Sequence, residues 1–534
     1  MEQMILLAAG ILIAGVFLNR LSGRLGIPVL LAFILLGMLC GSDGIFKIPF
    51  DNYQIAEHIC TLALVFVIFY GGFGTNWNQA RPVAVQAMLL SYAGTFLTAV
   101  LTGGFCCLAL KMPLLESLLL GAVISSTDAA SVFSILRSRK LNLKYNTASL
   151  LELESGSNDP CAYMMTAVLL MCMTGSNTAG GTAYLIFAQI VYGVLLSMLV
   201  AFGALWIFQH VSFGSAGFDA VFLAAVALLA YAAPASLGGN GFLSAYLVGI
   251  LLGNGRIPNK KALVHFFDGV TGLMQIVLFF VLGLLAFPSQ LPGVLAPALL
   301  TALFLTFVAR PAAVFILLAP FRSCLAQMLL VSWSGLRGAA SIAFAVMATI
   351  SPATTNQDLF HIVLTIVLFS IALQGFLIPL VSRKLDMLDE SADVMRTFND
   401  YSDQIPVQFI RFSVPEGHAW AGQRVRDILL PPGTLLVLLQ RDGEKLVPSG
   451  QTKLLARDTL ILSARAPDPA AGITLVEKRI GRGDPWIGKA ISAVSKDSGE
   501  LIITIQRGSK YIIPNGDTLV QENDLLTLHT SRDS

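Results

Sequence analysis

The chain has 534 residues, of which 55% are hydrophobic and only 12% are charged, and its mean hydropathy is +0.74. Soluble proteins average about 25% charged residues, so this composition excludes an ordinary soluble protein and indicates an integral membrane protein. The net charge of +2 gives no reason to expect nucleic acid or another polyanion as a partner.

The cysteines and histidines predict neither a disulfide framework nor a metal cofactor. All seven cysteines lie in the apolar part of the chain without a Cys-x-x-Cys pair, as expected of small buried side chains. The six histidines are scattered without the spacing of metal ligands. The first apolar segment lacks a basic start and a small-residue cleavage site, so we expect it to be a retained membrane span.

Polarity divides the chain into a membrane domain, residues 1–385, and a charged tail. Windows of apolar residues predict an all-α membrane domain of about thirteen transmembrane helices, near residues 4–19, 27–42, 55–73, 83–108, 113–136, 147–173, 181–208, 216–236, 240–254, 263–287, 292–318, 324–350 and 358–382.

Positively charged loops orient these helices. Alternate loops contain most of the basic residues, among them Arg20, Arg24, Arg81, Arg137, Arg139, Lys140, Lys144, Arg256, Lys260, Lys261, Arg322, Arg383 and Lys384. The other set of loops contains only Lys47 and Lys111. By the positive-inside rule we expect a multi-pass protein of the cytoplasmic membrane, with its N-terminus outside and its tail in the cytosol.

The sixth predicted span contains an unusual set of polar residues. Glu152, Ser155 and Asp159 follow the spacing i, i+3, i+7 and share one stripe of the helix. Glu154 and Asn158 are i, i+4 neighbours on a second stripe. Asp159 lies roughly 18 Å into the span, near the middle of a ~30 Å hydrocarbon core.

Carboxylates at this depth mark ion or proton paths, although polar residues can also form a satisfied helix–helix cluster without a transport role. Because four acidic or amide side chains lie on one helix, we favour the ion path. A carboxylate that binds either a cation or a proton exchanges one for the other, and one such site predicts one-for-one, electroneutral exchange.

The fifth and twelfth spans are each predicted to be interrupted in the membrane. Residues 125–131 form a polar run, residues 334–341 contain two serines and two glycines, and both stretches contain Ala-Ala-Ser. Interrupted helices in matching positions of two halves indicate an inverted-repeat transporter with its site at the midplane.

The remaining buried charges are Asp128, Arg310 and Arg337. A buried arginine requires a carboxylate partner, for which Glu154 and Asp128 are the candidates. The two arginines either stabilise the scaffold or take part directly in gating. Thr127 and Asp128, at the interruption of the fifth span, either coordinate a cation or cap a helix end.

These motifs together resemble one family. Thr127-Asp128, Glu154-Ser155-x-x-Asn158-Asp159, Ala309-Arg310-Pro311 and Gly335-Leu-Arg-Gly-Ala339 are similar to the electroneutral branch of the monovalent cation:proton antiporters. The resemblance implies an inverted-repeat fold, a homodimer, and movement of a core domain against a dimerisation domain.

The resemblance also implies roles for residues. Asp159 is then the ion- and proton-binding carboxylate, surrounded by Ser155, Thr127 and Asp128. Asn158 and Glu154 become structural partners.

For Glu154 the resemblance implies pairing with Arg310, with Arg337 as the alternative. Members often have an acidic residue in the third span where this chain has Tyr70, so a further cation ligand there is in doubt.

The tail begins with a linker, residues 386–404, and continues with two modules, residues 405–466 and 470–532. The modules repeat at an offset of 66 residues: Trp420, Arg441 and Asp458 correspond to Trp486, Arg507 and Asp524. Each resembles the C-terminal half of the RCK domains of potassium channels and transporters, which implies a dimeric, ligand-sensing α+β module.

The resemblance leaves more than one role for these modules, with or without a ligand. No Gly-x-Gly-x-x-Gly unit precedes them, so we do not expect NAD to bind. Cyclic di-AMP, which some bacterial relatives bind, is the possible regulator, and a plain dimerisation module is the alternative.

We therefore expect an antiporter that exchanges K⁺, or else Na⁺, for H⁺, under control of its tail. The RCK-like modules favour K⁺, because they accompany potassium handling. The alternatives are an RCK-gated cation channel, although no TVGYG-like filter is present, and a sensor with a vestigial transport domain. An enzyme has no support in the sequence.

Overall fold

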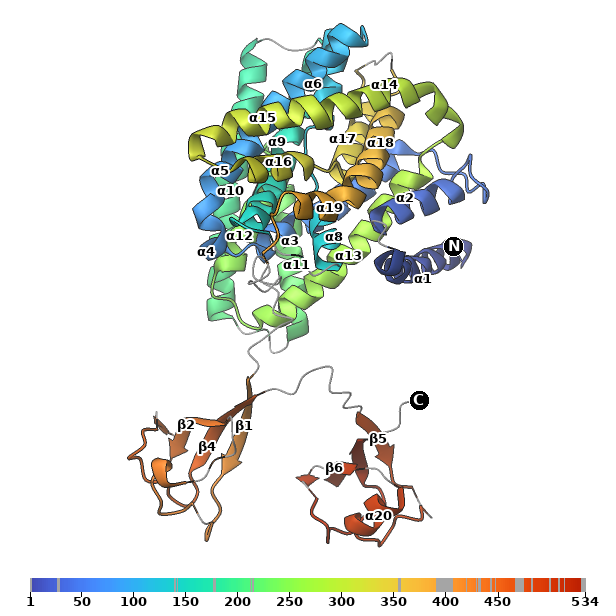
Figure 1. Cartoon of the computed structure of the whole chain (residues 1–534). Coiled ribbons are helices and arrows are strands. Elements are labelled where there is room, and N and C mark those ends of the chain that lie inside the picture. The colour runs from blue at the N-terminus through green and yellow to red at the C-terminus, as the bar shows by residue number, and fades with distance from the viewer. Residues whose placement is uncertain are drawn as a thin grey trace. The chain divides into compact units, whose positions relative to one another are not determined.

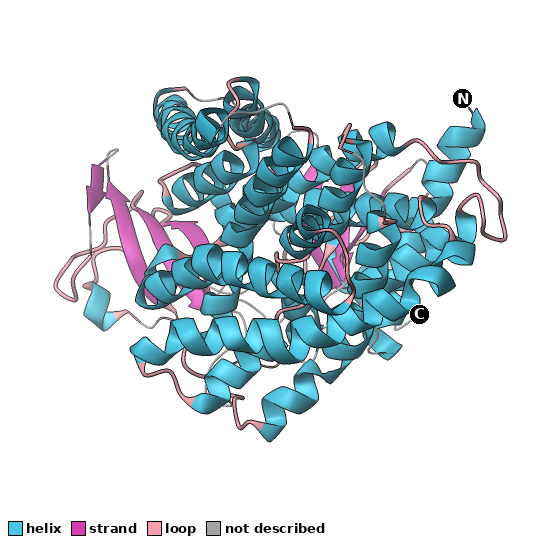
Figure 2. Ribbon diagram, turned by 90° about the horizontal axis from the view of Figure 1, so that it is seen from above, coloured by secondary structure: helices cyan, strands magenta, loops and turns pink. Residues whose placement is uncertain are grey.

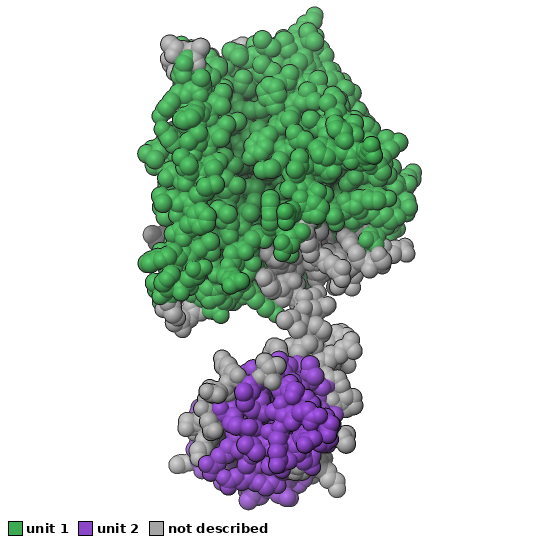
Figure 3. Space-filling view, turned by 90° about the vertical axis from the view of Figure 1, so that its left-hand side faces the viewer, with its two compact units in different colours: residues 1–401 green, residues 402–534 purple. Residues whose placement is uncertain are grey.

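The computed structural model describes residues 2–25, 29–138, 141, 143–175, 179–211, 213, 216–353, 357–389, 407–418, 420–428, 430, 434–441, 444–446, 448–465, 475–481, 484–498, 501–507, 510–512 and 514–529. Arg139, Lys140 and most of the predicted linker lie outside these residues. The chain forms two compact units, Met1–Tyr401 and Ser402–Ser534 (Figure 3).

The described part of the first unit is helical, apart from short connections and one isolated bridge (Figures 1 and 2). Seven of its described helices are long and apolar enough to cross a membrane. The helical segments are α1 (Glu2–Leu25), α2 (Val29–Cys40), α3 (Tyr53–Gly74), α4 (Trp77–Ala80), η1 (Arg81–Val83), α5 (Ala84–Leu89), η2 (Leu90–Gly94), α6 (Thr95–Ala109), α7 (Leu114–Val123), α8 (Ala129–Ser138), α9 (Thr147–Met173), α10 (Ala179–His210), α11 (Ala216–Ser236), α12 (Gly241–Asn254), α13 (Lys260–Leu284), η3 (Pro288–Gln290), α14 (Leu291–Phe304), η4 (Leu305–Ala309), α15 (Arg310–Leu318), η5 (Ala319–Phe321), α16 (Leu325–Trp333), α17 (Ala339–Ile350), α18 (Leu359–Phe369), η6 (Ser370–Gly375) and α19 (Phe376–Lys384).

Small residues let these helices approach one another closely, as expected where apolar lipid gives no hydrophobic drive to association. In the α3–α12 pair, a Cβ on Gly249 would lie 2.3 Å from the Phe69 carbonyl oxygen, and one on Gly72 would lie 2.4 Å from that of Tyr246. A Cβ on Gly283 of α13 would likewise lie 2.2 Å from the Ile34 carbonyl oxygen of α2. Glycine is required at these contacts because any side chain would force the helices apart. The helices α2, α3, α12 and α13 therefore pack into one group beside the site described below.

The second unit consists of two small modules with the same topology. The first contains β1 (Val407–Ser413), η7 (Val425–Asp427), β2 (Leu435–Arg441), β3 (Glu444–Leu446) and β4 (Thr459–Arg465), and the second contains β5 (Leu475–Arg479), α20 (Ile491–Ser498), β6 (Leu501–Arg507), β7 (Lys510–Ile512) and β8 (Leu525–His529). Their antiparallel sheets have the orders β1-β4-β2-β3 and β5-β8-β6-β7. Each has a register irregularity at the same place, between Leu436 and Leu438 and between Ile502 and Thr504. The duplication seen in the sequence is thus a duplication of structure.

Candidate ion-binding site

Two interrupted helices cross at the centre of the site. Non-helical residues separate α7 from α8 and α16 from α17. The Asp128 backbone N–H of the first interruption donates a 2.8 Å hydrogen bond to the Leu336 carbonyl of the second. The Ser126 and Ser341 hydroxyls also lie 3.3 Å apart. The two polar stretches that the sequence predicted to be interrupted therefore meet.

Charged side chains match the exposed ends of the half-helices. Asp128 Oδ1 accepts a 3.2 Å hydrogen bond from the Ser131 N–H in the first turn of α8, where a negative charge is favoured. Arg337, which is 1% exposed, donates from Nη1 to the carbonyls of Ser125 (2.7 Å) and Ser126 (2.8 Å), just beyond the C-terminal end of α7. A positive charge is favoured at that end. These charges stabilise backbone groups that the interruption leaves without helical partners.

The helix α9 is bonded to the first interruption by two side chains. Ser155 Oγ donates a 2.7 Å hydrogen bond to the Thr127 carbonyl. Asn158 Nδ2 donates a 2.6 Å hydrogen bond to Thr127 Oγ1. Asn158 is fully buried, and its Oδ1 has no hydrogen-bond partner in the part of the chain that the structure describes. Asn158 thus holds the interruption against α9 without adding a charge.

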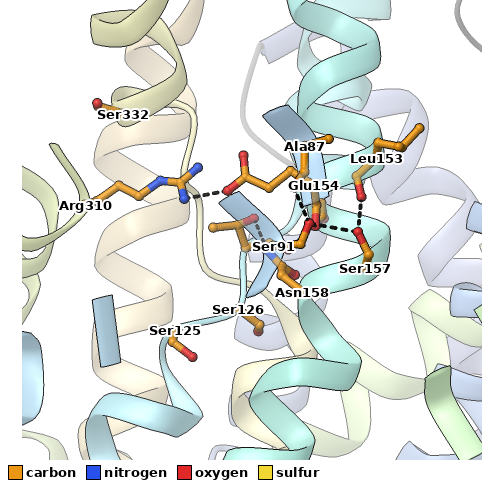
Figure 4. Close-up of polar contacts among 12 residues, drawn as sticks. Ala87, Ser91, Ser125, Ser126, Leu153, Glu154, Ser157, Asn158, Arg310 and Ser332 are labelled. Carbon is orange, nitrogen blue, oxygen red and sulfur yellow. Dashed lines mark hydrogen bonds and ion pairs between the residues drawn. The ribbon is translucent and has the colours of Figure 1, made fainter. Parts of the chain in front are cut away.

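A buried ion pair joins α9 to α15. Glu154 Oε1 lies 2.5 Å from Arg310 Nη1, and the two side chains are 1% and 3% exposed (Figure 4). Of the two arginines considered for Glu154, the structure therefore pairs it with Arg310, while Arg337 bonds to carbonyls. Gly335 makes room for this pair, because a Cβ there would lie 2.8 Å from Arg310 Nε.

Three π-helical turns, η2, η4 and η6, lie next to these polar groups, and such turns are frequent at functional sites. In η2, the single hydroxyl proton of Ser91 is shared between the Ala87 and Glu154 carbonyls, which lie 2.7 and 2.9 Å from Ser91 Oγ (Figure 4). In η6, Ser370 Oγ accepts a 3.1 Å hydrogen bond from the Arg337 N–H. The turn η4 directly precedes Arg310. These turns could not be predicted from the sequence, because a π turn depends on how neighbouring helices pack.

A cavity of about 490 Å³ opens beside the crossing, and all four residues expected at the ion site line it: Thr127, Asp128, Ser155 and Asp159. The Oδ1 atom of Asp159 is buried and has no hydrogen-bond partner among the described residues. The next residue of α9 is Pro160, which lacks a backbone N–H. The Gly156 carbonyl is therefore left without its helical hydrogen-bond donor, and Gly156 also lines the cavity. The cavity thus brings together carboxylate, hydroxyl and backbone oxygens, which are the ligands that hard cations prefer.

The cavity also contains residues that we did not predict as part of the site. Ser126 comes from the first interruption, and Asp268, Thr271 and Gln275 come from α13. The last three follow the spacing i, i+3, i+7 inside an apolar span, which is the same signal that identified the stripe on α9.

The two tail modules each contain one matching ion pair. Arg441 donates to Asp458 Oδ1 (2.8 Å) and Oδ2 (2.7 Å), and Arg507 donates to Asp524 at 2.8 Å to each oxygen. Hydrogen bonds from Arg441 and from the Leu455 N–H hold the pKa of the Asp458 carboxyl below its ordinary value. Each pair joins the end of one strand (β2 or β6) to the loop that precedes the last strand of the module (β4 or β8). The pairs are therefore structural features of each module.

Interrupted helices that cross beside a membrane-buried carboxylate define a secondary cation transporter. Comparison with known proteins identifies the family of transporters. The chain belongs to the sodium/hydrogen exchanger family, whose transmembrane model matches residues 8–384. The family consists of transporters, so the chain is not an enzyme. Two further matches, to the TrkA-C domain, cover residues 409–468 and 475–534.

Relatives over most of the chain include a protein named K(+)/H(+) antiporter NhaP from Alkalimonas amylolytica, 33% identical over 87% of this chain and 81% of that protein. The K(+)/H(+) antiporter NhaP2 of Shewanella baltica is 33% identical over 85% of this chain and 80% of its own. The solved structure of the sodium proton antiporter MjNhaP1 from Methanocaldococcus jannaschii has a TM-score of 0.64 and 24% identity, and it covers 72% of this chain and 99% of its own, so the fold is shared.

Proposed function

We propose that this protein exchanges K⁺ for H⁺ across the cytoplasmic membrane, one ion for one proton, with Asp159 as the group that both ions occupy in turn. The observation that carries the proposal is the position of Asp159. It faces a cavity lined by Thr127, Asp128 and Ser155, at the crossing of two interrupted helices.

Competition at one carboxylate couples the two fluxes. A proton on Asp159 removes the charge that attracts the cation, and a bound cation disfavours the proton. Thr127 and Ser155 supply uncharged oxygens that replace part of the cation's hydration shell. Only the occupied site is electrically neutral, so only the occupied site crosses the low-dielectric barrier between the two sides of the membrane.

The choice of K⁺ rests on the relatives. Two relatives that match more than four fifths of this chain are named as K⁺/H⁺ antiporters. The RCK-like modules, which accompany potassium handling, support the same choice. Na⁺ is the other cation that the site chemistry allows.

The remaining architecture follows the family resemblance. We infer thirteen transmembrane helices in two inverted repeats, with the N-terminus outside and the tail in the cytosol. The loops rich in arginine and lysine support this orientation. We also infer a homodimer in which the domain that contains the two interruptions moves against the domain that forms the dimer.

The tail is proposed to regulate exchange. Duplicated TrkA-C modules at residues 409–468 and 475–534 support a sensing role, and cyclic di-AMP is the effector that we propose to test first. Calorimetry with the purified full chain tests it: heat of binding that disappears when residues 402–534 are removed supports the effector, and no heat with the full chain excludes it.

Exchange itself is tested in proteoliposomes with an imposed pH gradient and a pH-sensitive dye, adding K⁺ or Na⁺ in turn. Cation-dependent recovery of pH that Asp159→Asn abolishes is the expected result, with K⁺ more effective than Na⁺. Recovery that persists in Asp159→Asn, in protein shown to be folded, would refute the assignment of Asp159.

A further inference from the structure

The cavity lies between two polar stripes of the same spacing. On α9, Glu152 and Asp159 are separated by seven residues, with Ser155 between them, and all three line the cavity. On α13, residues 268, 271 and 275 repeat this spacing and line the same cavity. Seven residues correspond to about 10 Å along a helix, so each stripe covers a similar length of the cavity wall.

One member of the stripe on α13 is buried and polar without a structural hydrogen bond among the described residues. Thr271 is 8% exposed, lines the cavity, and its Oγ1 has no hydrogen-bond partner among the described residues. Hydroxyl groups in membrane helices ordinarily donate to a carbonyl of their own helix, as Thr301 does to the Pro297 carbonyl at 2.7 Å. The buried hydroxyl of Thr271 is instead available to an ion in the cavity.

The end of this stripe nearest Lys260 is charged, and a hydrogen bond orients it. Tyr70 of α3 donates a 3.4 Å hydrogen bond to Asp268 Oδ1, and both residues line the cavity. Tyr70 occupies the position at which the resemblance expects an acidic residue. A carboxylate is therefore present at this point of the cavity wall, but it comes from α13 and is held by the tyrosine that replaces the acid.

We propose that Asp268, Thr271 and Gln275 form a second subsite for the transported monovalent cation, on the α13 wall of the cavity, where the cation binds before Asp159 receives it. This inference rests on the proposed exchange function. The carboxylate of Asp268 draws the cation into the cavity, and the hydroxyl of Thr271 and the amide oxygen of Gln275 replace hydration water on the way inward. Because α13 begins at Lys260, on the side that we infer to be cytosolic, the subsite serves loading from the cytosol.

The experiment measures the K⁺ dependence of exchange by the full chain in proteoliposomes. Asp268→Asn is expected to raise the KM for K⁺ about fivefold, the factor that corresponds to about 1 kcal/mol of lost attraction, while the maximal rate stays within about twofold. Thr271→Val shifts the KM in the same direction. The matched control is Asp386→Asn, which removes an exposed carboxylate bonded to Lys144 at 3.0 Å outside the cavity and leaves the KM unchanged.

A rescue separates a cation subsite from a structural role. Adding Tyr70→Glu to Asp268→Asn returns a carboxylate to the same place and lowers the KM toward that of the wild type. The proposal is overturned if both Asp268→Asn and Thr271→Val keep the wild-type KM, or if they lower only the maximal rate.

A second measurement distinguishes failure of the proposed exchange function from failure of the proposed subsite. If the wild type exchanges no cation, equilibrium binding of Tl⁺ to the purified full chain decides the subsite alone. The subsite predicts that Asp159→Asn retains weak Tl⁺ binding and that adding Asp268→Asn removes it. Equal binding by the single and double variants would overturn it.

Discussion

The ion pair between Glu154 and Arg310 yields the most quantitative prediction. Both side chains are almost fully buried, and the two charged atoms lie 2.5 Å apart. Removing one member of a buried pair leaves an uncompensated charge and costs about 3–5 kcal/mol, whereas replacing both members by neutral side chains is often nearly neutral. Arg310→Met should therefore lower the free energy of unfolding by about 3–5 kcal/mol, because it leaves Glu154 charged and buried.

The double variant Glu154→Gln/Arg310→Met should recover most of that loss. The interaction energy from the four proteins of the cycle is expected to be about 2–3 kcal/mol. The assay is a denaturant titration of the full chain in detergent micelles, followed by far-ultraviolet circular dichroism, since the helical signal reports the first unit.

A second cycle tests whether the correct arginine has been paired. Arg337 donates to the Ser125 and Ser126 carbonyls, so Glu154→Gln should rescue Arg337→Met less than it rescues Arg310→Met. Two results would refute the view that Arg310 neutralises Glu154. One is that the losses in the free energy of unfolding are additive in the Arg310 cycle, and the other is that Glu154 couples more strongly to Arg337.

Three further predictions follow from the site and the tail. Ser155→Ala removes the hydroxyl that bonds the Thr127 carbonyl and lines the cavity, so the KM for K⁺ in proteoliposomes should rise about fivefold, for a loss of about 1 kcal/mol; an unchanged KM would exclude Ser155 from the ion site. Gly338→Ala places a Cβ 2.5 Å from Asp128 Oδ2 and should cost about 1–3 kcal/mol of stability by overpacking, measured by the same denaturant titration, whereas full stability would show that the crossing is loosely packed. In the tail, the folded pKa of Asp458 lies below its unfolded value, so its ion pair stabilises the module fully above about pH 4 and is lost as the pH falls through the folded pKa. Asp458→Asn should therefore weaken β4 at neutral pH by about 1.5–3 kcal/mol and remove the acid-dependent loss, as measured by amide hydrogen exchange in the full chain; equal protection in both proteins would contradict this.

The sequence could indicate which residues line the cavity because its signals are local. Glu152, Ser155 and Asp159 share a stripe by helical periodicity alone, and a polar run in one apolar span and a glycine-containing run in another indicate interruptions without knowledge of the fold. Sequence periodicity could not choose between Arg310 and Arg337 for Glu154, because that choice depends on which helices pack together. The structure resolves it through the geometry of η4 and α15.

The polar stripe on α13 is visible in the sequence, but its position beside the ion site is not. Asp268, Thr271 and Gln275 lie inside an apolar span at the same i, i+3, i+7 spacing. Threonine and glutamine, however, commonly form hydrogen bonds between membrane helices, so these two residues alone do not indicate an ion site. What the sequence could not show is that this stripe lines the same cavity as Asp159. That relation arises because α13 packs closely on α2 through glycines such as Gly283 and also contacts α3.

The charges of Glu154, Arg310, Asp128 and Arg337 bear on the proposed exchange at Asp159. Glu154 and Arg310 cancel each other. Asp128 and Arg337 each match the opposite partial charge of a half-helix end, so neither needs a mobile ion. Asp159 forms no ion pair in the described part of the structure, and in the proposed exchange its charge is neutralised before the site moves through the membrane. A proton and a monovalent cation achieve the same neutral state, so the energy barrier is similar for both loaded forms and high for the empty one. This equivalence requires Glu154–Arg310 to stay paired in every state; a variant that frees either charge should uncouple cation from proton movement even when Asp159 is intact.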